Sequence, residues 1–144
     1  AMSDRVVVMS KGVVQQIGAP HDIYTTPANK MVADFIGLVN FIPGEAKGDR
    51  VFIKGTNVSF PNPTDITGDA TIAVRPENIS ISANGGQLEG TMVARFYLGD
   101  AVDYRVQCGE NMIRVIVKGA DVTAYPDGSK VYLDFDKTMV FGRD

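Results

Sequence analysis

Several residue types that build common catalytic and binding sites are scarce in this chain of 144 residues. A single cysteine, Cys108, excludes an intramolecular disulfide and favours a small buried thiol in a reducing compartment. A single histidine, His21, is too little for a histidine-based zinc site. No hydrophobic run reaches the roughly 18 residues of a membrane-spanning helix, and no signal peptide is visible. We therefore expect a cytoplasmic chain without a metal site.

Positive charge is also scarce. The chain has 14 Lys and Arg against 17 Asp and Glu, which gives a net charge of −3, and it has no tryptophan. Proteins that bind nucleic acids usually carry a basic face, and those that bind single strands also expose aromatic side chains for stacking. Since no cluster of Lys and Arg is visible, the composition argues against DNA or RNA as a partner.

Short alternating runs of apolar and polar residues fill the chain from residue 38 onward, and such runs predict β-strands. The clearest pattern is a hairpin over residues 101–117. One face of its first strand carries Val102, Tyr104, Val106 and Cys108, and the other face carries Asp103, Arg105 and Gln107. Pro76 should interrupt the pairing between two further strands. Many short strands with glycine at the corners predict a small closed barrel, and two strand groups, about 41–82 and about 88–142, leave two half-barrels as an alternative.

The first 37 residues have a different pattern. Residues 5–18 predict two short strands around Gly12, which can adopt the positive φ of a tight turn. Residues 19–37 have the period of helices, with Pro27 suited to a first helical position and Gly37 to a C-terminal cap. The predicted fold class is therefore mainly β, with a small α/β appendage at the N-terminus.

These N-terminal residues also contain motifs in a specific order. Residues 3–9 read S-D-R followed by hydrophobic residues and methionine, residues 12–20 fit G-x-x-x-Q-x-G-x-P, and residues 23–37 fit I-Y-x-x-P-A-x-x-x-V-A-x-F-I-G. In this order the motifs closely resemble the end of the nucleotide-binding domain of ABC importer ATPases. In that family a C-terminal OB-like β domain, called TOBE, follows. Residues 73–81 and 96–106 look like segments of that domain.

The resemblance implies two domains. Residues 1–37 would be the tail of the nucleotide-binding domain, and residues 38–144 would be the OB-like TOBE domain for regulation and dimerisation. The resemblance places Ala1 just after the switch histidine of the ATPase core, and the chain contains no G-x-x-x-x-G-K-[ST] loop to hold phosphates. We therefore expect no catalytic or cofactor-binding residue here and no ATP hydrolysis by this chain alone; ATP and Mg²⁺ are implied for the missing core.

The resemblance also implies partners. It implies a homodimer, attachment to membrane subunits through the missing core at the inner face of the plasma membrane, and regulation by a bound protein or small molecule. The candidate interface or regulatory residues are Arg75, Glu77, Phe96, Tyr97, Tyr104 and Phe141. Phe41, Ile42 and Phe60 are further candidates for an exposed apolar patch, although most such residues could instead belong to the core. Glu77, Asp100 and Asp103 read as a solvated rim.

Two questions stay open at this point. The transported solute could be a polyamine or ferric iron, to which residues 37–44 and 96–106 look closer, or a sugar. The alternative function is a stand-alone OB-like module that binds small oxyanions such as molybdate or acts as a regulator. The ATPase-like motifs of residues 3–37 argue against it. An enzyme in its own right has the least support, because no nucleophile and base can be paired.

Overall fold

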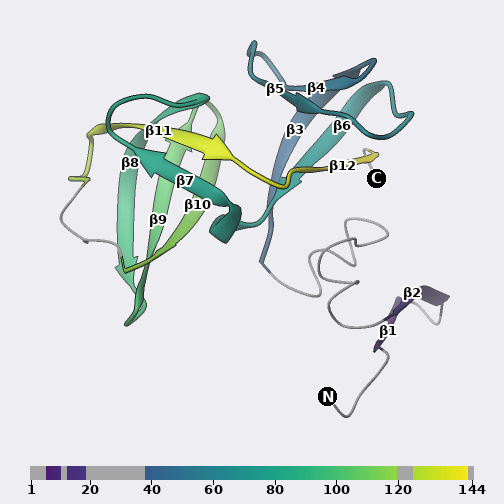
Figure 1. The fold of residues 1–144 in the computed structure, drawn as a ribbon, viewed down its shortest axis with the longest axis horizontal. Helices are drawn as coiled ribbons and strands as arrows, with labels where there is room; N and C mark the ends of the chain where they lie inside the picture. The colour runs from purple at the N-terminus through teal and green to yellow at the C-terminus, as the bar shows by residue number, and fades with distance from the viewer. Residues whose placement is uncertain (1–5, 11–12, 19–37, 120–124, 143–144) are drawn as a thin grey trace. The chain divides into compact units, whose positions relative to one another are not determined.

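The computed structural model describes residues 6–10, 13–18, 38–119 and 125–142 (Figure 1). The chain divides into two compact units, Ala1–Val39 with Asp144, and Asn40–Arg143. The predicted domain boundary after residue 37 stays a prediction.

The first unit contains an antiparallel hairpin of β1 (Val6–Ser10) and β2 (Val13–Gly18). This confirms the two strands predicted within residues 5–18. Gly12 and the helices predicted over residues 19–37 lie outside the described residues. The helical part of the predicted α/β appendage is therefore not shown.

The second unit consists, in its described part, of ten strands and one short 3₁₀-helix, η1 (Pro76–Asn78). The strands are β3 (Asn40–Lys47), β4 (Arg50–Ile53), β5 (Ser59–Pro61), β6 (Gly68–Val74), β7 (Ile79–Ser82), β8 (Leu88–Tyr97), β9 (Ala101–Cys108), β10 (Asn111–Lys118), β11 (Lys130–Phe135) and β12 (Met139–Gly142). The prediction of a mainly β domain is confirmed.

These strands form two antiparallel five-stranded sheets, which fits the alternative of two half-barrels better than the single closed barrel. The first sheet has the order β12-β6-β3-β4-β5 and the second has the order β10-β9-β8-β11-β7. Figure 1 shows the second sheet strongly curled, as in half of a barrel. The predicted strand groups were wrong in detail, because β7 joins the second sheet and β12 returns to pair with β6 of the first.

Pro76 marks the place where the chain changes sheets. Its ring nitrogen has no hydrogen to donate to a ladder, and it occupies the first position of η1, directly between β6 and β7. The interruption predicted there is therefore confirmed. The structure adds that the interruption separates two sheets.

One hydrophobic core holds the two sheets together. Alternate residues of β3 are buried, and the buried side chains of both sheets belong to one cluster. The rings of Phe60 (β5) and Phe135 (β11) stack across it with centroids 5.2 Å apart. Within β9, Val102, Tyr104 and Val106 share one face, as the alternation predicted, and all three are fully buried. Fully burying such side chains contributes roughly 1.5–3 kcal/mol each.

A polar contact adds to this connection. The Nδ2 group of Asn40 (β3) donates a hydrogen bond to the carbonyl oxygen of Arg114 (β10), and the Arg114 backbone N–H donates to Asn40 Oδ1, both at 2.9 Å. The amide therefore satisfies both backbone groups of Arg114 on the side of β10 that faces away from β9. In the sheet order, β10 is an edge strand, so this amide takes the place of a neighbouring strand.

Candidate functional site

The six predicted interface or regulatory residues do not converge on one site. Phe96 and Tyr97 lie exposed at the end of β8, and Phe141 is half-buried on β12. Glu77 is exposed in η1, but its neighbour Arg75 is buried. Tyr104 is fully buried on β9, so its side chain belongs to the core rather than to the surface. The interface role of these residues stays a prediction.

The exposed aromatic residues surround the turn from β8 to β9. Phe96, Tyr97 and Leu98 expose 48%, 69% and 52% of their surface. The Leu98 N–H donates to the carbonyl oxygen of Ala101, and Gly99 has a φ of +90°, which suits glycine. The chain therefore turns at Gly99 between β8 and β9. We call Phe96, Tyr97 and Leu98 the apolar tip.

The other candidates for an exposed patch are divided between surface and core. Ile42 and Phe60 are almost completely buried, so they belong to the core, the alternative that the sequence left open. Phe41 keeps 38% of its surface exposed. The reason is the alternation along β3 and β5, which turns Ile42 and Phe60 into the core between the sheets.

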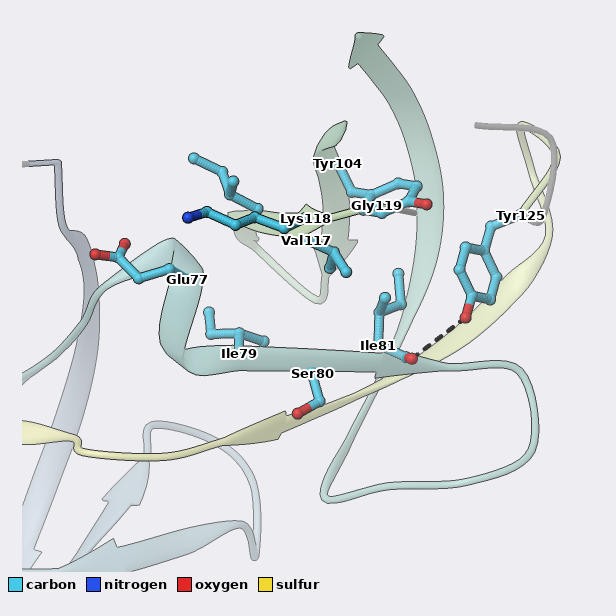
Figure 2. Close-up of a pocket in the computed structure, with 10 residues that line it drawn as sticks. Glu77, Ile79, Ser80, Ile81, Tyr104, Val117, Lys118, Gly119 and Tyr125 are labelled. Atoms are coloured by element: carbon cyan, nitrogen blue, oxygen red, sulfur yellow. Dashed lines mark hydrogen bonds between the residues drawn. The ribbon is translucent and has the colours of Figure 1, made fainter. Parts of the chain in front are cut away.

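A groove of about 680 Å³ runs along the gap between β7 and β10, the two edge strands of the curled sheet. Figure 2 shows Ile79, Ile81 and Val117 along its length, with Glu77 and Lys118 toward one end and Tyr104 and Tyr125 toward the other. The lining is thus apolar in the middle and polar at the ends. Such a shape can accept a small amphipathic molecule.

The aromatic end of the groove is held by two contacts. The rings of Tyr104 and Tyr125 meet edge to face with centroids 5.6 Å apart. The hydroxyl of Tyr125 donates to the carbonyl oxygen of Ile81 at 3.3 Å, the dashed line in Figure 2. Tyr125 therefore connects the inner face of β9 with β7. This fixes one end of the groove.

The outer face of the curled sheet carries a charged cluster that the sequence did not reveal. Asp103 is only 2% exposed, which corrects its assignment to a solvated rim. Arg105 donates from Nε and Nη2 to its two carboxylate oxygens at 3.3 Å each, and Arg114 donates from Nε and Nη2 to the same oxygens. Burial alone would raise the pKa of Asp103, but the hydrogen bonds and charges of the two arginines outweigh it and lower the pKa.

An aromatic ring extends this cluster. The guanidinium of Arg105 lies 4.9 Å from the ring centroid of Phe96, which is directly opposite Asp103 in the β8–β9 pairing. The signal that could have revealed the cluster is the Asp-x-Arg spacing of 103 and 105, which places both side chains on one face of a strand. Their third partner, Arg114, comes from another strand.

The remaining candidates for chemistry have little in the structure to support them. Cys108 is a buried free cysteine, and its burial raises the pKa of the thiol to about 11. Within the described residues, no three His, Cys, Asp or Glu side chains gather where a metal could bind. No helix in that part of the chain is long and apolar enough to cross a membrane.

Comparison with known families defines the class of this β domain. Residues 72–141 match the TOBE domain. This span runs from β6 to β12, and includes both the groove and the charged cluster. The chain contains a TOBE domain, as the resemblance of its motifs predicted.

The relatives place that domain within a larger family, and the chain is homologous to ATP-binding subunits of ABC importers. It is 34% identical to the Fe(3+) ions import ATP-binding protein FbpC of Rhizobium etli, over 94% of this chain and 40% of the relative. It is 35% identical to the FbpC protein of Fusobacterium nucleatum, over 100% and 41%. It is 39% identical to the spermidine/putrescine import ATP-binding protein PotA of Ruegeria pomeroyi, over 73% and 31%. The chain thus spans less than half the length of these relatives.

Proposed function

We propose that this chain acts as the C-terminal accessory part of an ABC importer ATP-binding subunit and supports dimerisation and regulation of ATP-driven solute import. The observation that carries the proposal is similarity to importer subunits over 94% and 100% of the chain, including the region before the TOBE domain. ATP, Mg²⁺ and the membrane subunits would be partners of the whole subunit, at the inner face of the plasma membrane.

The names of the same relatives support a proposal for the cargo. Their names specify ferric ions or the polyamines spermidine and putrescine. We therefore propose that the importer to which this chain belongs carries a cation of one of these two kinds. Uptake of labelled putrescine and of ferric iron by cells that lack the gene tests this: loss of one uptake supports the proposal, and loss of sugar uptake alone contradicts it.

The apolar tip offers a surface for dimerisation. Its three neighbouring side chains are about half exposed or more, and aromatic residues of this kind often anchor protein interfaces. A second copy could bury the tip of one chain against that of the other. Phe96 and Tyr97 are the predicted interface residues that are well placed for this contact, whereas Tyr104 is not.

Sedimentation velocity over a range of concentrations tests the dimer. We expect the double variant Phe96→Ser/Tyr97→Ser to weaken self-association at least about tenfold, because two anchors are lost. The control is Met112→Ser, since Met112 is 49% exposed on the same sheet at the far end of β10. A wild-type chain that stays monomeric throughout, or an equal effect of the control, would contradict the proposal.

The alternative function, a module for small oxyanions, has less support in the groove. Lys118 is the one cationic side chain among the groove residues described, and the groove also contains Glu77. Its isoleucine and valine side chains offer no hydrogen bonds to an oxyanion, and its side-chain hydroxyls are limited to Ser80, Tyr104 and Tyr125. Titration with molybdate decides between the two: saturable binding that Lys118→Gln abolishes would favour the alternative.

A further inference from the structure

The charged cluster on the outer face of the curled sheet gathers two like charges around one buried carboxylate. Arg105 and Arg114 are directly opposite each other in the β9–β10 pairing. Like charges in this position repel each other, and the carboxylate of Asp103 offsets that repulsion at a desolvation cost. Because apolar residues can often replace such a buried cluster without loss of stability, the presence of these charges points to function.

The cluster also presents positive charge to the surroundings. The side chain of Asp103 is 3% exposed, whereas those of Arg105 and Arg114 are 33% and 32% exposed. An approaching molecule therefore meets two guanidinium groups with the carboxylate beneath them. Two arginines and one aspartate leave a charge of +1 on a chain whose net charge is −3.

The guanidinium groups keep hydrogen-bond capacity. Within the described residues, the hydrogen bonds of Arg105 and Arg114 to Asp103 use Nε and Nη2 of each side chain. The Nη1 groups of both can donate further, since a guanidinium has five N–H donors. Two such groups on opposite residues can hold one carboxylate between them.

An apolar contact lies beside this position. The ring of Phe96 is 48% exposed and lies against Arg105. The surface thus combines arginine and aromatic side chains, the types that are enriched among interface residues with large binding contributions. We call Phe96, Asp103, Arg105 and Arg114 the arginine surface.

We propose that the arginine surface docks an acidic segment of a partner protein. One carboxylate of that segment bridges the Nη1 groups of Arg105 and Arg114. The charge complementarity of this surface, on an otherwise acidic chain, is what argues for such a partner. This inference rests on the regulatory part of the proposed function and specifies the chemistry of the partner. It does not depend on dimerisation, which is measured separately.

The test uses two short peptides and the 144-residue chain. The probe is acetyl-Leu-Glu-Leu-amide, and acetyl-Leu-Gln-Leu-amide is the matched neutral peptide. We expect the Glu peptide to shift the side-chain Nε–H signals of Arg105 and Arg114 in NMR spectra at low ionic strength. The Gln peptide should bind about tenfold more weakly, because it lacks the charge-assisted bonds. Added salt should weaken the binding of the Glu peptide but not that of the Gln peptide.

Variants locate the binding. Arg105→Gln and Arg114→Gln should each abolish the difference between the two peptides. Arg105→Lys should restore part of it, because lysine keeps the charge but loses the planar fork. Arg50→Gln is the control, since Arg50 lies on the other sheet and bonds to Ser59. If circular dichroism shows that a variant is unfolded, the comparison of the two peptides on the wild-type chain tests the inference instead.

Three outcomes would overturn the inference. Equal binding of both peptides would remove the role of the carboxylate. An equal loss in Arg50→Gln would show general charge attraction. Shifts at Arg105 and Arg114 that follow chain concentration without peptide would assign the surface to a second copy of this chain. The last outcome would leave the proposed dimer intact, so the two proposals fail separately.

Discussion

The inner face of β9 and Asp103 on its outer face are buried to a similar extent but by different means. On the inner face, Val102, Tyr104 and Val106 have no exposed surface and belong to the core cluster. On the outer face, Asp103 is buried to nearly the same extent beneath two arginines. The inner face stabilises the fold through apolar burial. On the outer face, much of the attraction between Asp103 and the two arginines only offsets the cost of desolvating the carboxylate. Burial by itself therefore does not distinguish a stabilising face from a binding face.

The largest expected effect is on the inner face. Ile113→Ala removes a fully buried side chain opposite Val106, and we expect a loss of about 2–5 kcal/mol in the free energy of unfolding. Met112→Ala, on the outer face of the same strand, should change it by less than about 0.5 kcal/mol. Urea unfolding followed by circular dichroism measures both. Similar losses in the two variants would remove the distinction between the faces.

The next effect is on the outer face. Asp103→Asn leaves two opposing arginines without their counter-charge, and we expect a loss of about 1–3 kcal/mol, less than for a fully enclosed ion pair because both arginines are partly exposed. Asp127→Asn is the control, since Asp127 pairs with Arg95 at the surface and should cost about 1 kcal/mol or less. An unchanged free energy of unfolding in Asp103→Asn would show that the cluster does not stabilise the outer face.

Acid should weaken the outer face of β9 in the wild-type chain without affecting its inner face. The pKa of Asp103 in the folded state is below the ordinary value of 3.8, because of the two arginines. Its contribution to stability is complete well above that value and is lost as pH falls through it toward the folded-state pKa. Unfolding free energies between neutral pH and acid should therefore fall less steeply in Asp103→Asn than in the wild type. Parallel curves would contradict this.

The smallest effect concerns Cys108 at the end of β9. Burial raises its pKa to about 11, so little thiolate exists in the folded chain at pH 8. We expect a thiol reagent such as Ellman's reagent to react slowly with the native chain and fast in guanidinium chloride. Fast reaction of the native chain would show that this end of the inner face opens.

The sequence predicted which residues of β9 share a face, but not that Tyr104 belongs to the core or that Asp103 is covered. Alternation alone places Val102, Tyr104 and Val106 on one side, and a run of apolar residues on one side of a strand is usually buried. The same alternation places Asp103 and Arg105 on the other side but cannot say whether they are covered. The cover depends on Arg114, which the register of β10 brings opposite Arg105.

The sheet arrangement shows the same limit. Pro76 predicted an interruption, because its effect on a ladder is local. The return of β12 to β6 is a pairing between distant segments, in which Met139 lies opposite Ala73. No local pattern specifies it. Many short strands therefore left both a single barrel and two half-barrels open, and the two sheets of the structure support the second.

The side-chain amide of Asn40 has a consequence for how the chain behaves at high concentration. An exposed edge strand is a template on which other chains can add and begin to aggregate. At Arg114 both outward backbone groups of β10 are already occupied by that amide. An incoming strand would have to displace two good hydrogen bonds before it could add there. The side chain of Asn40 therefore protects this part of the edge strand against the addition of further strands.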